Sequence, residues 1–148
     1  MNLRNLLIIV VIFTTLVFYN QFVAKEAVVN TKESPLVVSL ISYPETTKVG
    51  NRNTFIWQVN ATNDLSTDFS TLYWSANSSP SALTKLDSPS AVGYERFVHD
   101  FTSGIFFLPY TFESVMVFDQ PQTVYFRAYT KVRDNHLWSE ERKITILP

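Results

Sequence analysis

The stretch that decides the fold is Thr123–Arg133, which reads TVYFRAYTKVR. Apolar and polar side chains alternate along it, as they do in a β-strand that packs one face against a core. The face predicted to point inward holds Val124, Phe126, Ala128, Thr130 and Val132. The face predicted to point outward holds Tyr125, Arg127, Tyr129, Lys131 and Arg133.

Similar short runs precede and follow this strand. Thr54–Ala61 alternates as clearly, and we expect four of its residues to face inward, namely Phe55, Trp57, Val59 and Ala61. The other predicted strands are Leu36–Tyr43, Phe69–Ala76, Tyr94–Phe101, Glu113–Phe118 and Trp138–Leu147. Roughly seven short strands without an amphipathic helical stretch predict an all-β fold, a two-sheet sandwich over residues 36–148.

The segment Val124–Ile146 resembles the last two strands of fibronectin type III and related immunoglobulin-like domains. These domains often carry an aromatic-x-Phe-Arg strand, a turn, and a Trp-Ser strand with a β-branched ending. The matching residues here are Phe126-Arg127, Trp138-Ser139 and Ile144-Thr145-Ile146, and Trp57 is similar to the family's buried tryptophan. The resemblance implies an Ig-like or fibronectin type III-like sandwich. The chain departs from the pattern at Val124, where the family usually has its corner tyrosine, and between Trp74 and Phe118.

The N-terminal part of the sequence is apolar. Leu6–Tyr19 contains no charge, and Leu3–Val23 gives 21 residues, or about 31 Å as a helix, which matches a bilayer core of about 30 Å. We therefore predict a single-pass transmembrane signal anchor over residues 3–24 and a stalk over residues 25–35, ahead of the sandwich. The stretch is too uniformly apolar and β-branched for a helix buried in a soluble core.

A cleaved secretory signal is the alternative to an anchor. Cleavage after Ala24 would place the bulky Phe22 at position −3, and cleavage after Ala27 would place the charged Lys25 there, so both sites fit poorly. Basic residues are nearly balanced across the apolar stretch, with Arg4 before it and Lys25 and Lys32 after it. The short basic start predicts a cytosolic N-terminus, with the C-terminal domain outside the plasma membrane or in the cell envelope.

Composition excludes several kinds of chemistry. The 148 residues include no Cys, so disulfides, thiolate metal sites and a cysteine nucleophile are excluded. The formal net charge of −1 provides no global field for nucleic acid. The sequence contains no Gly-rich phosphate loop, HExxH, GxSxG or CxxC motif. We predict no catalytic residue, no cofactor and no metal.

The titratable residues form no recognisable site. The only histidines are His99 and His136, too few for the three protein ligands that a metal site normally needs. The acidic pairs Glu140-Glu141 and Glu95/Asp100 have no fixed separation, and we interpret them as solvated. Members of a Ser-His-Asp triad meet in space rather than in order, so a cryptic hydrolase stays a low-ranking alternative.

The most unusual stretch is Phe101–Phe112, in which seven of twelve residues are large and apolar or aromatic. Side chains alternate along a strand, so the consecutive residues 105–108 cannot all face one core. Two interpretations follow: a segment folded over one end of the sandwich, or an exposed surface for a partner protein or the membrane. The candidate partner surface also takes in the outward face of residues 123–133, and consists of Ile105, Phe106, Phe107, Leu108, Tyr110, Tyr125, Arg127 and Tyr129.

Two N-glycosylation sequons are present, Asn60-Ala61-Thr62 and Asn77-Ser78-Ser79. Their use would require export and a host that glycosylates.

The sequence predicts a membrane-anchored, non-catalytic surface protein that presents its domain for protein recognition or structural assembly. Its expected partners are membrane lipid, through the N-terminal helix, and an unknown protein, but no nucleic acid. The alternative is a secreted or periplasmic binding module with a cleaved signal peptide.

Overall fold

The computed structural model describes residues 35–61, 65–94 and 96–148. The chain divides into two units, residues 1–32 and 33–148, and all described residues belong to the second. The predicted anchor at 3–24 and the stalk up to residue 34 lie outside the described residues. Among the residues that are described, no helix is long and apolar enough to cross a bilayer.

The described chain forms eleven strands and one short 3₁₀ helix. Their bounds are β1 Val37–Ser42, β2 Thr46–Lys48, β3 Arg52–Asn60, β4 Ser66–Thr67, β5 Phe69–Ser75, η1 Pro89–Ala91, β6 Arg96–Phe97, β7 Phe106–Phe107, β8 Tyr110–Val117, β9 Gln122–Val132, β10 Asn135–Trp138 and β11 Arg142–Leu147.

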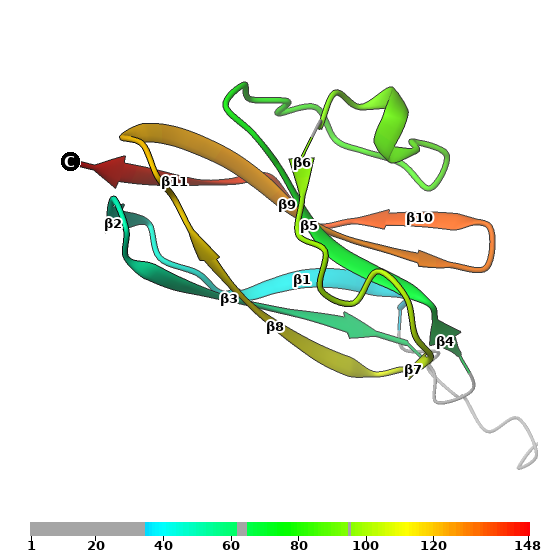
Figure 1. Ribbon diagram of the computed structural model, residues 1–148. Helices are drawn as coiled ribbons and strands as arrows, with labels where there is room; N and C mark the ends of the chain where they lie inside the picture. Colours follow the sequence, from blue (N-terminus) through cyan, green and yellow to red (C-terminus); the bar gives the residue numbers. More distant parts are fainter. Residues whose placement is uncertain (1–34, 62–64, 95) are drawn as a thin grey trace, which may run out of the picture. The chain divides into compact units, whose positions relative to one another are not determined.

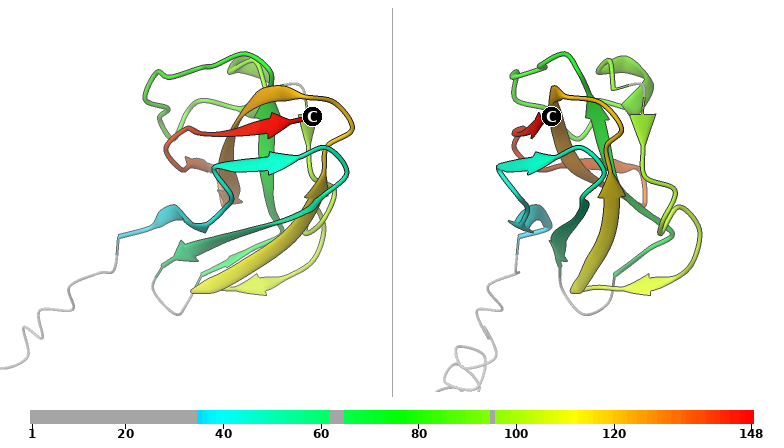
Figure 2. Two further views of the ribbon diagram at one scale, coloured as in Figure 1. Left: turned by 90° about the vertical axis from the view of Figure 1, so that its left-hand side faces the viewer. Right: turned by 60° about the vertical axis from the view of Figure 1, so that its left-hand side comes forward.

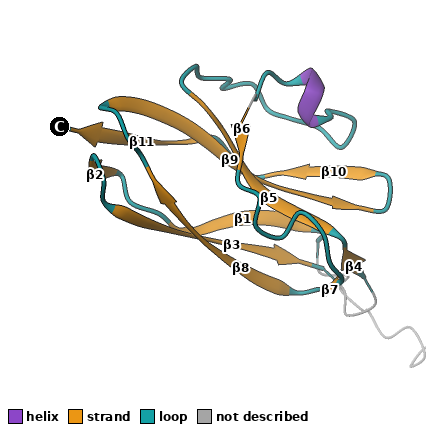
Figure 3. Cartoon of the chain, viewed as in Figure 1, coloured by secondary structure: helices purple, strands orange, loops and turns teal. Residues whose placement is uncertain are grey.

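Two sheets face each other (Figures 1 and 3). The first has the strand order β1-β3-β8, and the second has the order β2-β11-β9-β5-β6, with β10 also paired to β9. The β2–β11 pair is parallel, and the other pairs are antiparallel. Because the chain passes from β3 to β5 and from β8 to β9 between the sheets, the arrangement is an immunoglobulin-like β-sandwich.

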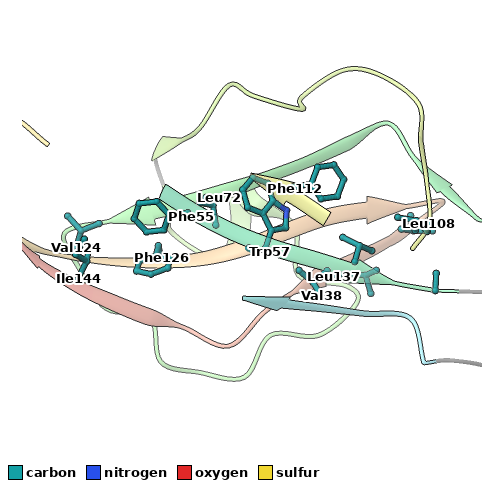
Figure 4. Packing of buried hydrophobic residues seen from close by; sticks show 14 of the residues in the cluster. Val38, Phe55, Trp57, Leu72, Leu108, Phe112, Val124, Phe126, Leu137 and Ile144 are labelled. Carbon is teal, nitrogen blue, oxygen red and sulfur yellow. The ribbon is translucent and has the colours of Figure 1, made fainter. Parts of the chain in front are cut away.

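The predicted inward faces of the two best strands are confirmed. Phe55, Trp57 and Val59 of β3 are buried, with Ala61 just after it, as are Val124, Phe126, Ala128, Thr130 and Val132 of β9. Figure 4 shows Phe55 and Trp57 of β3 meeting Val124 and Phe126 of β9 between the sheets. Trp57 stacks on Phe112 with ring centroids 5.5 Å apart, and its Nε1 donates to Ser70 Oγ at 2.8 Å. The indole is thereby buried with its polar atom satisfied.

Strand boundaries differ from prediction where the chain crosses the open side of the sandwich. Within the predicted strand Tyr94–Phe101, regular pairing is limited to Arg96–Phe97. Beyond it, isolated backbone hydrogen bonds to β5 continue at Val98 and Phe101, up to the turn at Phe101, where φ is +57°. Phe101 covers the core there. Its ring and the Trp57 ring meet edge to face, with their centroids 6.0 Å apart. The predicted strand Glu113–Phe118 begins earlier, at Tyr110, because β8 pairs with almost the full length of β3.

The register of the strands defines two ends of the sandwich. Val37 pairs with Asn60, and Val59 pairs with Tyr110, so the start of β1, the end of β3 and the start of β8 share one end. We call it the near end; it also holds β4, β7 and the turn after β9 (Figure 1). The opposite, far end holds Val117, Gln122 and Leu147.

Candidate recognition surfaces

The outward face of β9 is covered over much of its length. The prediction that Arg127 and Tyr129 lie on an exposed surface is wrong, since they are 4% and 3% exposed. Aromatic rings of β5 and β10 pack on Tyr129. Arg127 is covered by the segment 76–97, which crosses the outer face of the second sheet (Figures 1 and 2). We call this segment the cover. The other residues of the predicted outward face fit the prediction better: Lys131 of β9 and Arg133 in the turn after it are exposed, and Tyr125 is half-buried.

The Arg127 guanidinium holds the cover to the sheet. Its Nη2 donates to the carbonyl oxygens of Ser79 at 2.7 Å and Ser81 at 3.0 Å, both in the cover. Its Nη1 donates to Ser139 O at 2.9 Å, and its Nε donates to Tyr94 Oη at 3.0 Å. A buried guanidinium needs such acceptors, because an unpaired buried charge is strongly unfavourable.

Tyr94 connects this cation to the carboxylate of Glu141. The Tyr94 hydroxyl donates to Glu141 Oε2 at 2.6 Å, and Ser78 Oγ and Ser79 N donate to the same carboxylate. Burial alone would raise the pKa of Glu141, but these donors and the Arg127 charge together lower it. Burial and the adjoining carboxylate raise the pKa of Tyr94, so its hydroxyl stays protonated. The network is an ionised carboxylate, a neutral phenol and a guanidinium in sequence.

An aromatic cluster fills the remaining space beneath the cover. Tyr73, Tyr94 and Tyr129 are buried there and pack against Trp138. The Tyr129 hydroxyl is hydrogen-bonded to His136 Nδ1 at 2.6 Å. This second core has its own hydrogen bonds and explains why aromatic residues are abundant on a face that alternation predicts to be exposed.

An open groove remains beside the cover. It has a volume of about 550 Å³ and adjoins the Tyr125 side of β9, towards the far end. It is lined by two tyrosines, two threonines, two acidic and two basic residues, namely Tyr43, Glu45, Thr46, Tyr125, Glu141, Arg142, Lys143 and Thr145. Aromatic surface combined with charges of both signs suits recognition of another polypeptide. Of the predicted partner residues, only Tyr125 lies here.

The apolar stretch at residues 105–108 alternates between solvent and core. Ile105 and Phe107 are each 73% exposed, whereas Phe106 is half-buried and Leu108 is 3% exposed. The prediction that Leu108 belongs to a partner surface is therefore wrong, because β7 pairs with β4 and turns this side chain into the core. Together with Tyr110, which is 39% exposed, Ile105 and Phe107 form the apolar tip of the near end.

The histidines and carboxylates do not converge. His99 is exposed beside the Phe97 ring, while His136 is engaged by Tyr129. Glu140 forms an exposed ion pair with Arg142 at 2.9 Å, and Glu95 lies outside the described residues. Within residues 35–61, 65–94 and 96–148, no three His, Asp or Glu side chains cluster in a way that would hold a metal ion.

The two candidate glycosylation residues occupy different settings. Asn60 is half-buried at the end of β3, and Asn77 is exposed in the cover just after β5. The use of either sequon stays a prediction.

Sequence reasoning missed the residues that join the cover to the sheet. Ser79, Tyr94 and Glu141 are scattered along the chain and meet only in the fold. One signal was present: an arginine stands among aromatic residues in the middle of a long strand. A long charged side chain with aromatic neighbours often buries its stem against them.

No protein-family model matches the chain, and no curated protein matches it. Among solved structures, the chain is similar to the PKD domain of an M14-like peptidase from a Thermoplasmatales archaeon, with 14% identity and a TM-score of 0.49 over 78% of this chain and 97% of that one. It is also similar to the CARDB domain of a Pyrococcus furiosus protein, solved in complex with di-metal ions, with 6% identity and a TM-score of 0.44 over 78% and 90%. The fold assignment rests on the strand order given above.

Replacing Arg127 by methionine tests the network. The change leaves Tyr94 and three carbonyl groups without their donor, so we expect unfolding of the full chain in detergent micelles to require at least about 2 kcal/mol less free energy. We also expect faster proteolysis within residues 76–94. Lys131→Met, at an exposed position on the same face of the same strand, is the matched control and should change stability by no more than about 0.5 kcal/mol. Equal effects of the two changes would show that the cover is held by other contacts.

Proposed function

We propose that the chain is a membrane-anchored, non-catalytic surface protein whose immunoglobulin-like domain serves protein recognition or structural assembly. The observation that carries the recognition role is the groove beside Tyr125. It lies beside a sheet, is open to solvent, and offers aromatic, cationic and anionic groups together.

The fold favours binding over catalysis. The groove contains Glu45 and Glu141 but no histidine, and Glu141 is already committed to Tyr94, Ser78 and Ser79. A general acid or base needs a free proton-accepting or proton-donating atom at a substrate, and this carboxylate has little capacity left. The remaining groups suit reversible contacts.

A closer relationship to fibronectin type III domains is part of the same proposal. It is supported by the burial of Trp57 and by the contacts that join the two sequence motifs. Arg127 Nη1 donates to Ser139 O, and Ser139 Oγ accepts from Ala128 N at 2.9 Å.

Anchoring is supported by the apolar stretch at residues 3–24, which is long enough to cross a bilayer as one helix. The domain would then lie outside the membrane on a short stalk, in the plasma membrane or cell envelope, with the N-terminus in the cytosol. Lipid is the first partner in this scheme, and a protein bound at the groove is the second.

Membrane retention tests the anchor. We expect the full chain to stay in membranes after alkaline carbonate washing and to keep its intact N-terminus by mass spectrometry. Val10→Arg places a charge at the centre of the apolar stretch at a cost of about 2.5–3.5 kcal/mol, and should release a large fraction of the protein. Asn20→Arg, near the end of the stretch where the side chain reaches the headgroups, is the matched control and should be retained. A mature chain shorter by about 24–27 residues would instead establish the secreted alternative.

Photo-crosslinking from the groove tests the recognition role. A photoreactive amino acid at Tyr125 of the full chain in its native membrane should give a discrete adduct of defined mass. Placed at Thr54, which is exposed on the outer face of the first sheet, the same group should give none. Adducts of equal yield and mass from both positions would contradict the assignment of the groove as the contact surface.

A further inference from the structure

The most exposed apolar side chains at either end of the sandwich, Ile105 and Phe107 at 73% each, lie at the end at which the described chain begins; Val117 and Leu147 at the far end are 56% and 42% exposed. Pro35 and Leu36 lead into β1, whose first residue, Val37, pairs with the last residue of β3. The β3–β8 and β4–β7 pairings place Tyr110, Phe107 and the neighbouring Ile105 at this same end. Figures 1 and 2 show the start of β1, β7 and the start of β8 together at one end, and Figure 1 shows the C-terminus at the other.

We propose that the apolar tip of the near end, formed by Ile105, Phe107 and Tyr110, inserts into the lipid surface and seats the domain on the membrane. The proposal rests on the anchor proposed above, and it names lipid as the occupant of this surface. The tip lies away from the groove, which is towards the far end.

The length of the stalk keeps the near end close to the bilayer. Ten residues, 25–34, separate the predicted span from Pro35. Ten residues reach at most about 35 Å, whatever their conformation. The nine residues of β3 span about 30 Å, so the far end stands a further domain length from the attachment point. The near end is therefore the part of the domain with the highest effective concentration at the lipid surface.

The packing of β7 fixes the direction in which the tip points. The Phe106 ring sits against Phe101, Tyr110 and Phe112, with centroid distances of 5.8, 5.5 and 5.3 Å. Because the residues on either side of an inward-pointing side chain point the opposite way, Ile105 and Phe107 are held in solvent at 73% exposure each. Two large apolar side chains held in water beside a half-exposed tyrosine are the composition of a membrane-interface contact.

Charges beside the tip allow contact with headgroups. A groove of about 300 Å³ places Lys131 and Arg133 next to Ile105, and Asp68 lines it as well. Asp134, in the following turn, is also exposed. The two cations reach lipid phosphates on flexible stems, but the two carboxylates offset their charge. The apolar side chains therefore dominate, and we expect the contact to depend only weakly on anionic lipid.

The absence of cysteine from the chain allows a direct test with single-cysteine variants of the full protein. Phe107→Cys, labelled with the environment-sensitive dye NBD, reports the tip. Val117→Cys, a 56% exposed apolar position at the far end, is the matched control. Ile105→Cys gives a second report from the tip, and like the other two positions it lies outside the core. The proteins are reconstituted in phosphatidylcholine vesicles, with or without phosphatidylserine.

We expect the labels at 107 and 105 to emit at shorter wavelength than the label at 117. Lipids with a nitroxide near the headgroup should quench the labels at 107 and 105 several-fold more strongly than the label at 117. This difference should hold at every protein-to-lipid ratio and change little with phosphatidylserine. Equal quenching at all three positions in a chain that resists carbonate washing would overturn this inference and leave the anchor standing. If the label at 107 is shielded from water only at a high protein-to-lipid ratio, a second copy of the chain covers the tip. That result would also overturn the inference. A chain that fails to stay with the vesicles would contradict the anchor itself.

Discussion

The buried guanidinium of Arg127 imposes the strongest constraint on this domain. A permanently charged group that is 4% exposed requires acceptors in several directions, and the second sheet alone does not provide them. The carbonyl groups of Ser79 and Ser81 complete the set, so the irregular segment after β5 must return across the sheet. Tyr94, in the cover, and Glu141, between β10 and β11, extend the same network. As a result the middle of β9 is buried on both faces, whereas the outer face of the first sheet, with Ile41, Val115 and Val117, is open to solvent.

The main core was predictable because it depends on a local pattern. The alternation of β9 and β3 separates the two faces of each strand, and the more apolar face packs inward in both. A period of two also explains the stretch at 105–108, where exposure changes at every residue. The immunoglobulin-like order of the strands agrees with the resemblance of residues 124–146 to that class of domain.

What covers the second face of a strand was not predictable from alternation. Alternation places Tyr125 and Tyr129 on the same face, yet Tyr125 lines a groove and Tyr129 is buried. The rings that cover Tyr129 include those of β5, which are distant in sequence, so the local pattern does not reveal them. The parallel pairing of Thr46–Lys48 with β11 was missed for a similar reason: a three-residue strand has too short a pattern, and only its long-range partner defines it. The network residues are individually ordinary and acquire their roles through contacts distant in sequence.

The positions of the two candidate surfaces fit a domain with distinct proximal and distal roles. The apolar tip shares an end with the start of β1, and the mixed-charge groove lies on the second sheet towards the opposite end. In the proposed arrangement, lipid contact restricts the tilt of the domain, and the groove stays accessible to a partner in front of the membrane. Pre-orienting a recognition surface in this way lowers the entropy lost on binding.

Native-state hydrogen exchange of the full chain in detergent micelles tests the double burial of β9 most directly. If the cover and the core both protect this strand, the amides around Arg127 and Tyr129 exchange only through global unfolding, as slowly as those at the centre of β3. The free energy of opening of these amides should then fall with denaturant concentration at the same slope as that of the β3 amides. Exchange of these β9 amides through a low-energy local opening, independent of denaturant while β3 stays protected, would contradict the account.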